Sequence, residues 1–188
     1  MTPSPDSPSP LPTPTGSGRL EGLWATHAEK VYRAAYRVTG NAADAEDAVQ
    51  TVFLRLARLP DGKLREDAGG FLHRSAVNAG LDILRSRQRA GWVPLERLER
   101  VESSFGASEL GNPERDRSTR ELRRRLRLAL SRLSPRAAEM FALRYFEGLG
   151  NAEIADLLSV SPGVVAVLLH RTRARLRKEL KALEGEVS

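Results

Sequence analysis

Apolar residues recur at helical spacing along most of the chain, and short polar breaks divide them into successive helices. The clearest stripe lies in 42–59, where residues three or four positions apart form one apolar face: Ala45, Ala48, Val49, Val52, Phe53 and Leu56. The same spacing predicts helices over 19–38 and about 70–89. No stretch keeps the two-residue alternation of a half-buried strand. The pattern therefore predicts an all-α fold.

Residues that start or stop helices mark the boundaries of these elements. Gly40 is placed to end the first helix, and Asn41 is placed to cap the second. Pro113 and Pro135 each follow a polar residue that can cap a helix, and proline fits the first helical position. The sequence therefore predicts one helix from Pro113 to Leu133 and another from Pro135.

Composition divides the chain into segments. Residues 1–18 are rich in Pro, Ser and Thr and bury too little apolar surface to fold, so we expect a disordered tail. Residues 91–112 show little periodicity, and we interpret them as a flexible linker. We therefore expect two small helical domains, a three-helix bundle at 19–90 and a second domain at 113–182, with a short tail at 183–188.

The segment 151–181 predicts two helices joined by a tight turn. Ser161 can cap the second helix, and Pro162 fits its first position. Basic residues crowd the C-terminal half of that helix: Arg171, Arg173, Arg175, Arg177, Lys178 and Lys181. This is the plan of a helix-turn-helix, whose second helix enters the DNA major groove. The alternative is an amphipathic hairpin with a solvated basic face, because Arg near a helix C-terminus also favours the helix dipole.

The helix predicted over 70–89 carries a second polar face opposite its apolar stripe. Its members are Arg74, Asn78, Asp82, Arg85 and Arg89, and Arg87 adds charge near the end. Arg and Asn are residue types that contact phosphates and base edges. This face is either a nucleic-acid contact or an ordinary solvated surface.

Charge and composition narrow the function classes. The net charge of +6 and the pI near 10.3 suit a polyanionic partner. The chain has no Cys, and its three His residues are scattered, so no metal-ligand cluster is indicated. No nucleotide-binding or hydrolytic motif is present, and no apolar run approaches the roughly 20 residues that span a bilayer. We expect a cytoplasmic protein that is not an enzyme, needs no cofactor and is not inserted in a membrane.

The chain resembles the sigma-70 factors of the extracytoplasmic-function type, which direct bacterial RNA polymerase to promoters. The N-terminal half carries the runs TGNAADAEDAVQTVFLRL (39–56) and FLHRSAVNAGLDILRSR (71–87), which are similar to region 2 of that family. The C-terminal half carries LSPRAAEMFALRYFEGL (133–149), NAEIADLL and LHRTRARLRKEL (169–180), which are similar to region 4. Both sets occur in order and at family spacing.

The resemblance implies a role for each domain. Region 2 would dock on core RNA polymerase through its acidic second helix, at Asp44, Glu46, Asp47 and Gln50. Its third helix would recognise and melt the minus-10 element of promoter DNA with Arg74, Asn78, Asp82, Arg85, Arg87 and Arg89. Region 4 would read the minus-35 element, with candidate contacts at Ser161, Val164, Val167, Leu168, His170, Arg171, Arg173 and Arg175.

The predicted recognition helix departs from the family pattern. Family members typically present Thr, Lys, Ser and Arg where this chain has Val164, Ala166, Val167 and Leu168. Apolar side chains offer contact chiefly to thymine methyl groups, so we expect weak or unusual minus-35 readout. The apolar patch would either bind a regulator such as an anti-sigma factor or be buried against region 2. Ser159 stands where the family often has a left-handed Gly, at a cost of roughly 1 kcal/mol if that backbone is kept.

Our main prediction is a sigma factor that binds core polymerase and directs promoter recognition and melting, with no small-molecule substrate. The alternative is a sigma-like interaction protein that binds an anti-sigma factor or polymerase without reading DNA. The apolar recognition helix favours the alternative, and the basic face of the third helix favours the main prediction. An ordinary helix-turn-helix repressor would leave the N-terminal domain without a role.

Overall fold

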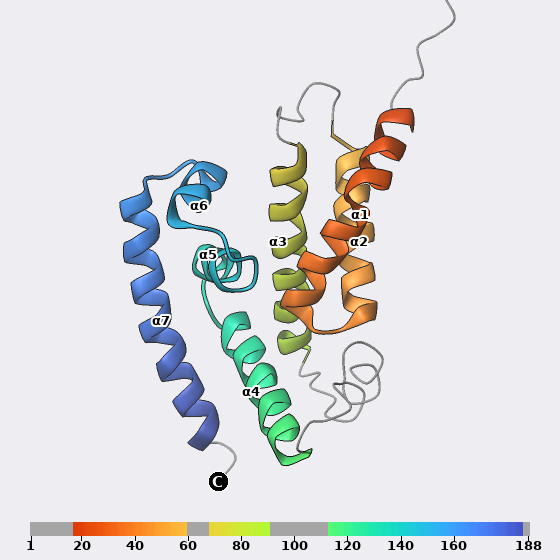
Figure 1. Ribbon diagram of the computed structural model, residues 1–188. Coiled ribbons are helices and arrows are strands. Elements are labelled where there is room, and N and C mark those ends of the chain that lie inside the picture. Colours follow the sequence, from red (N-terminus) through yellow and green to blue (C-terminus); the bar gives the residue numbers. More distant parts are fainter. Residues whose placement is uncertain (1–16, 60–67, 91–112, 186–188) are drawn as a thin grey trace, which may run out of the picture.

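The computed structural model describes residues 17–59, 68–90 and 113–185, and these ranges form seven α-helices and no strand (Figure 1). The all-α prediction is confirmed. The helices are α1 (Ser17–Thr39), α2 (Ala42–Ala57), α3 (Ala68–Arg89), α4 (Pro113–Ser131), α5 (Pro135–Tyr145), α6 (Asn151–Leu158) and α7 (Pro162–Gly185). Nearly all of the predicted disordered tail at 1–18, and the predicted linker at 91–112, lie outside the described residues.

Helices α1, α2 and α3 pack around a shared apolar interior. All six residues of the apolar stripe on α2 are buried, as the sequence predicts. The turn between α1 and α2 also follows its prediction. Gly40 has φ +65° and its N–H donates to the carbonyl of Tyr36 at 2.7 Å, while the Asn41 side chain accepts from the N–H of Asp44 at 3.0 Å. A left-handed glycine and an N-cap therefore reverse the chain within two residues.

Helices α4 to α7 form the C-terminal unit. Its interior is made of buried apolar residues from all four helices: Leu130, Met140, Leu143, Ile154, Leu158, Val165, Leu169 and Leu176. Helices α6 and α7 meet at a bend of 107°. Ser159 lies at that bend with φ 53° and ψ 51°, so the left-handed backbone considered from the sequence is kept. Ser161 caps α7 by accepting from the N–H of Val164 at 3.4 Å.

The end of α7 differs from its prediction. The helix runs to Gly185, so the tail predicted at 183–188 begins too early. Leu183 is 5% exposed and extends the buried series of Leu169 and Leu176 at seven-residue spacing. Burial of this leucine stabilises the extra helical turn. Leu122 lies at helical spacing from Leu126 and Ala129, which would place it on the apolar side of α4, but it is 58% exposed.

The two units pack against each other along α3. In Figure 1, α3 lies between the α1–α2 pair and the C-terminal unit, and α3 contacts α4, α5 and α6. The buried residues of both units form one continuous apolar cluster.

Within the described ranges, no single helix is long and apolar enough to cross a membrane, and the bent pair α6–α7 qualifies on length and composition only.

Candidate functional site

The predicted polymerase-docking residues divide between surface and interior. Glu46, Asp47 and Gln50 are exposed on α2. An open groove of about 420 Å³ runs beside them, between α1 and α2, and Trp24 and Tyr32 contribute its aromatic wall. Exposed carboxylates beside an aromatic-lined groove form a surface that a protein partner can contact.

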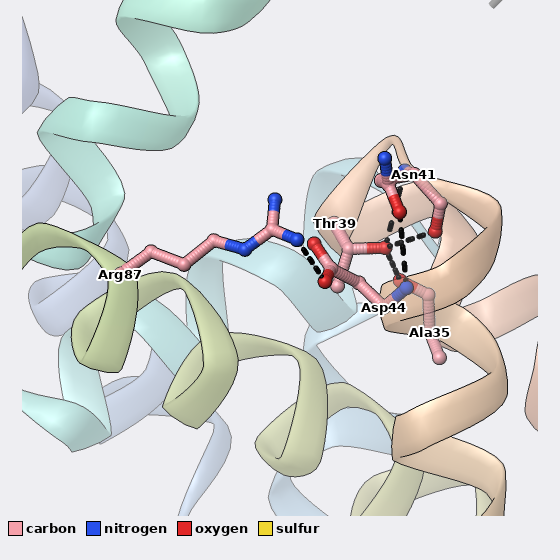
Figure 2. A network of polar contacts seen from close by, with 5 residues as sticks. All are labelled: Ala35, Thr39, Asn41, Asp44 and Arg87. Carbon is pink, nitrogen blue, oxygen red and sulfur yellow. Dashed lines mark hydrogen bonds and ion pairs between the residues drawn. The ribbon is translucent and has the colours of Figure 1, made fainter. Parts of the chain in front are cut away.

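Asp44 does not belong to that surface, contrary to the sequence-based expectation. It is 3% exposed, and its Oδ1 pairs with Nη2 of Arg87 on α3 (Figure 2). Burial is the main reason that the pKa of Asp44 is raised above its ordinary value, and Arg87 opposes that rise. Its position in the first turn of α2 also suits an acid, because the helix dipole favours negative charge there. Asp44 therefore ties α2 to α3.

The pair belongs to a larger polar network at the α1–α2 turn, drawn in Figure 2. The Thr39 hydroxyl lies 3.0 Å from the carbonyl oxygen of Ala35 and accepts from the N–H of Asn41 at 3.4 Å. Arg87 reaches this network from the C-terminal end of α3. Arg87, predicted to contact DNA, thus has a structural partner in this conformation.

The remaining predicted DNA-contact residues of α3 face different surroundings. Arg74 Nε and Asn78 Nδ2 both donate to Oε1 of Glu139 on α5, at 2.7 and 2.8 Å. Asp82 is exposed and accepts from Nη1 of Arg85 at 3.1 Å. The Nε and Nη2 atoms of Arg85 are buried without a hydrogen-bond partner among the described residues.

Arg89 is exposed at the end of α3, so the structure brings only part of the predicted face to the surface. The N-terminal part of this face contacts the C-terminal unit through Glu139, although the Arg74 side chain remains 37% exposed. The polar face predicted from the sequence is therefore neither fully solvated nor fully open to a partner in this conformation.

A second acidic residue meets the N-terminal unit close by. Glu147 follows α5, and its side chain is 1% exposed. Its Oε1 accepts from Nε of Arg37 on α1 at 2.8 Å, and its Oε2 lies 2.7 Å from Nε2 of His73 on α3. Burial alone would raise the pKa of Glu147, but hydrogen bonds and charges from Arg37 and His73 lower it to about 2.

Glu139 and Glu147 were not predicted as functional residues. A signal was present for Glu139, because it neighbours Ala138 and lies three residues before Ala142 on the buried side of α5. An acid on an apolar helix face requires a cationic or hydrogen-bonding partner. Which partner it takes depends on how the two units meet, and helical spacing carries no information about that.

The predicted region 4 contacts lie on the outer side of α7. His170, Arg171, Arg173 and Arg175 are exposed. Val164 and Val167 are 44% and 51% exposed, while Leu168 is partly buried against the core. The idea that the whole apolar patch is buried against the N-terminal unit is therefore wrong. The basic residues are free to approach a polyanion, and the apolar ones are open to a partner.

Comparison with known proteins gives matches to both halves of the chain. The family model for sigma-70 region 2 matches residues 23–90, and the model for sigma-70 region 4 matches residues 123–176. The RNA polymerase sigma factor CarQ of Myxococcus xanthus is 33% identical over 173 residues, which cover 90% of this chain and 93% of that protein. The ECF RNA polymerase sigma factor SigL of Mycobacterium tuberculosis is 32% identical over 170 residues, covering 87% and 90%.

A third relative is longer than this chain. The ECF RNA polymerase sigma factor SigE of Mycolicibacterium smegmatis is 36% identical over 163 residues, which cover 86% of this chain and 62% of that protein. Among solved structures, CnrH in complex with the cytosolic domain of CnrY is similar at a TM-score of 0.49 and 21% identity. That match covers 89% of this chain and 92% of CnrH.

Proposed function

This chain belongs to the sigma-70 family, as a sigma factor of the extracytoplasmic-function type that directs transcription initiation, and on that premise we propose which of its surfaces bind polymerase and which bind DNA. The observation that carries the proposal is the match of region 2 and region 4, in order, over 23–90 and 123–176. Each region then has one exposed surface suited to its partner. RNA polymerase catalyses RNA synthesis in the cytoplasm, and this chain supplies recognition of the promoter.

Core RNA polymerase binds the N-terminal unit at α2. Glu46, Asp47 and Gln50 are exposed there and supply carboxylate and amide groups, and the adjoining groove supplies apolar contact through Trp24 and Tyr32. Buried aromatic anchors with a polar rim are typical of protein interfaces. Asp44 acts indirectly, because its burial against Arg87 fixes the start of α2.

Promoter DNA binds α3 at the minus-10 element. Arg74, Asn78, Arg85 and Arg89 supply donors for phosphates and base edges along one side of the helix, and Asp82 orients Arg85. A basic face of this kind neutralises the phosphates of a single strand while the protein holds its unpaired bases. Both contacts favour the melted state of the duplex.

Region 4 contributes affinity with little sequence discrimination. The exposed His170, Arg171, Arg173 and Arg175 hold phosphates, which positions the helix without reading bases. Val164 and Val167 stand where base contacts would be made and offer only apolar contact. Most promoter specificity therefore comes from the minus-10 element.

The exposed Val164 and Val167 favour one second candidate function. A sigma-like interaction protein would use this patch to bind an anti-sigma factor and would not read DNA with α7. Such a protein would bind core polymerase without initiating from any template.

The test is run-off transcription with purified core polymerase, on promoters selected from a random library by this protein. Specific initiation is expected, and it is expected to be lost on combining Arg85→Ala with Arg89→Ala. Replacing the exposed Lys30 and Arg33 of α1 by Ala is the matched control, because it removes equal charge from exposed positions outside α3. Core binding without initiation on any selected template would contradict the proposal and favour the interaction protein.

A further inference from the structure

The groove between α1 and α2 has an aromatic wall that packing against α2 holds in place. The ring centroid of Trp24 lies 4.6 Å from that of Phe53 on α2, yet 47% of Trp24 is exposed. Tyr32 lines the same groove two turns further along α1, and the small Ala28 lies between them. Side chains that are already fixed lose little freedom when a ligand binds. The groove is therefore preformed for an apolar, extended occupant.

The polar residues of the groove limit the charge of that occupant. Glu29, Glu46 and Gln50 complete the lining, and all three are exposed. Two carboxylates at the rim repel an acidic segment at close range. Aromatic-lined grooves of this kind recognise Pro-rich segments, whose rings pack on the aromatic faces. The groove thus suits a Pro-rich segment without acidic side chains.

A segment of this composition precedes α1 in the same chain. Residues 8–14, PSPLPTP, have proline at every second position, one leucine and no charged side chain. Asp6 carries the one charged side chain of residues 1–16. Pro-rich sequences favour an extended helix even when unbound, so binding costs them little conformational entropy. Residues 8–14 lie outside the described residues, and their sequence matches both the aromatic wall and the acidic rim of the groove.

The length and the attachment point of this segment allow it to reach the groove. Thr15 and Gly16 alone separate it from Ser17, the first residue of α1, and Gly16 allows the chain to reverse there. The helix from Ser17 to Tyr32 is about 22 Å long at about 1.5 Å per residue. Residues 8–14 cover about 20 Å at about 3.1 Å per residue. Folded back along α1, the segment passes Trp24 and approaches Tyr32, at a local concentration on the order of millimolar.

We propose that residues 8–14 bind in the groove between α1 and α2, with their proline rings on Trp24 and Tyr32. A consequence for polymerase rests on the proposed function, in which core polymerase contacts the same groove. The segment and polymerase then compete for it. If the segment occupies the groove in about nine of ten molecules, the apparent affinity for polymerase falls about tenfold.

The test measures the distance from the segment to α2 in the full chain by electron spin resonance. The labels are placed at Ser9→Cys and Ala57→Cys. Ala57 is exposed outside the groove, and the chain has no other Cys. We expect one narrow distance population in the labelled parent. Replacing all four prolines of residues 8–14 by Ala is expected to give a broad distribution. A broad distribution in the parent would overturn the proposal.

A matched control keeps every proline and changes four other residues of the same region. It combines Ser4→Ala, Ser7→Ala, Thr13→Ala and Thr15→Ala, and the narrow distance population is expected to remain. Equal broadening by the proline variant and by this control would overturn the proposal, because the prolines would then not be the groups that bind.

A second pair of variants tests the groove without altering the segment. Tyr32 and Tyr36 are both partly buried on α1, with ring centroids 6.1 Å apart, and of the two Tyr32 lines the groove. We expect Tyr32→Leu to broaden the distances and Tyr36→Leu to leave them narrow, with circular dichroism confirming that both variants are folded. The same distances in both variants would place the segment elsewhere and overturn the proposal.

A mixture of singly labelled chains tests whether a second copy supplies the segment. One chain carries the label at Ser9→Cys and the other at Ala57→Cys. No defined distance is expected between them. A narrow distance in the mixture would show that the segment of one molecule fills the groove of another, which would overturn binding within one chain.

The affinity of the unlabelled chains for purified core polymerase separates this proposal from the proposed function. The four-proline variant is expected to bind about threefold to tenfold more tightly than the parent, and the Ser/Thr control is expected to bind like the parent. Distances that respond as expected, with equal affinity in all chains, would support the segment in the groove and reject the groove as a polymerase contact. A broad distance distribution in a parent that initiates specifically in run-off transcription would reject the segment alone.

Discussion

At the scale of single residues, Ser159 has a strained backbone conformation that a substitution could relieve. It is the one non-glycine residue with positive φ in the part of the chain that the structure describes. The left-handed region costs a non-glycine residue about 1 kcal/mol, whereas glycine adopts it freely. We expect Ser159→Gly to raise the free energy of unfolding by about 0.5 kcal/mol, since the greater freedom of Gly in the unfolded chain offsets part of the gain.

Urea denaturation measures this change, and Ser134→Gly is its control. Ser134 precedes α5 with an ordinary φ of −60° and makes no capping hydrogen bond, so Gly there has no strain to relieve. The control is expected to be neutral or destabilising. Equal effects of the two substitutions would show that the backbone at Ser159 is not strained.

Glu147 is expected to lose its stabilising effect in acid. Its pKa is about 2 in the folded protein against an ordinary value of 4.5, because Arg37 and His73 outweigh the effect of burial. The folded value lies below the unfolded one, so the stabilisation is complete above the unfolded pKa and disappears as pH falls through the folded pKa. At neutral pH it amounts to at most about 3 kcal/mol.

The measurement is the free energy of unfolding of the parent and of Glu147→Gln as a function of pH. The parent is expected to exceed the variant by roughly 1–3 kcal/mol near neutral pH, and the difference is expected to shrink toward zero by about pH 2. Glu29→Gln, at an exposed pair with Arg33, is the control and is expected to change stability by less than about 0.5 kcal/mol. A difference for Glu147→Gln that does not depend on pH would contradict this origin.

Asp44 shows what the sequence alone could not decide at this scale. An acid in the first turn of a helix is favoured by the dipole whether it faces solvent or the interior. Its burial depends on Arg87, a residue of another helix that approaches only when α2 and α3 have packed. The neighbouring Glu46, Asp47 and Gln50, predicted with it as polymerase contacts, are exposed, and their role stays a prediction.

At the scale of elements, α7 combines a basic surface with an apolar one. Val167 is 51% exposed, so a longer polar side chain fits there without disturbing the core. We expect Val167→Lys to strengthen binding to double-stranded promoter DNA. One added phosphate contact is expected to steepen the dependence of log K on log salt concentration by about 0.9.

Anisotropy titrations of the polymerase-bound protein at several salt concentrations give both quantities. Val167→Met keeps the length of the side chain without the charge, and it is expected to leave the salt dependence unchanged. If Val167→Lys and Val167→Met show the same salt dependence, this face of α7 does not approach DNA.

Helix spacing predicted the elements well because each helix buries a continuous stripe. Six apolar positions of α2 follow the expected period and are all buried, and Gly40 and Asn41 form the predicted turn. The errors concern positions whose burial depends on packing against other helices. Leu183 extends α7 because it is buried, and Leu122 is exposed although it follows the period.

At the scale of the whole molecule, the continuous apolar cluster couples the two units. Since α3 contributes to the N-terminal interior and also contacts α4, α5 and α6, we expect the free chain to unfold in one cooperative transition. Combining Glu139→Gln with Glu147→Gln is expected to separate that transition into two, because the carboxylate contacts with the N-terminal unit are lost.

Differential scanning calorimetry checks this expectation through the ratio of calorimetric to van't Hoff enthalpy, which is near one for a single transition. The double variant Glu29→Gln with Asp156→Asn, which removes two exposed acids, is the comparison and is expected to keep one transition. Two resolved transitions in the parent chain would show that the units are independent despite their contact.

The absence of a Cβ at Gly40 leaves room for the Arg127 side chain of the C-terminal unit. Any side chain there would meet the guanidinium of Arg127 and would also have to adopt a φ of +65°. A replacement at this one codon would therefore displace the Arg127 side chain from the carbonyl of Val38 and strain the turn, while leaving every charged residue in place. Gly40 is therefore a position where one substitution disturbs both the α1–α2 turn and the contact of α4 with the end of α1.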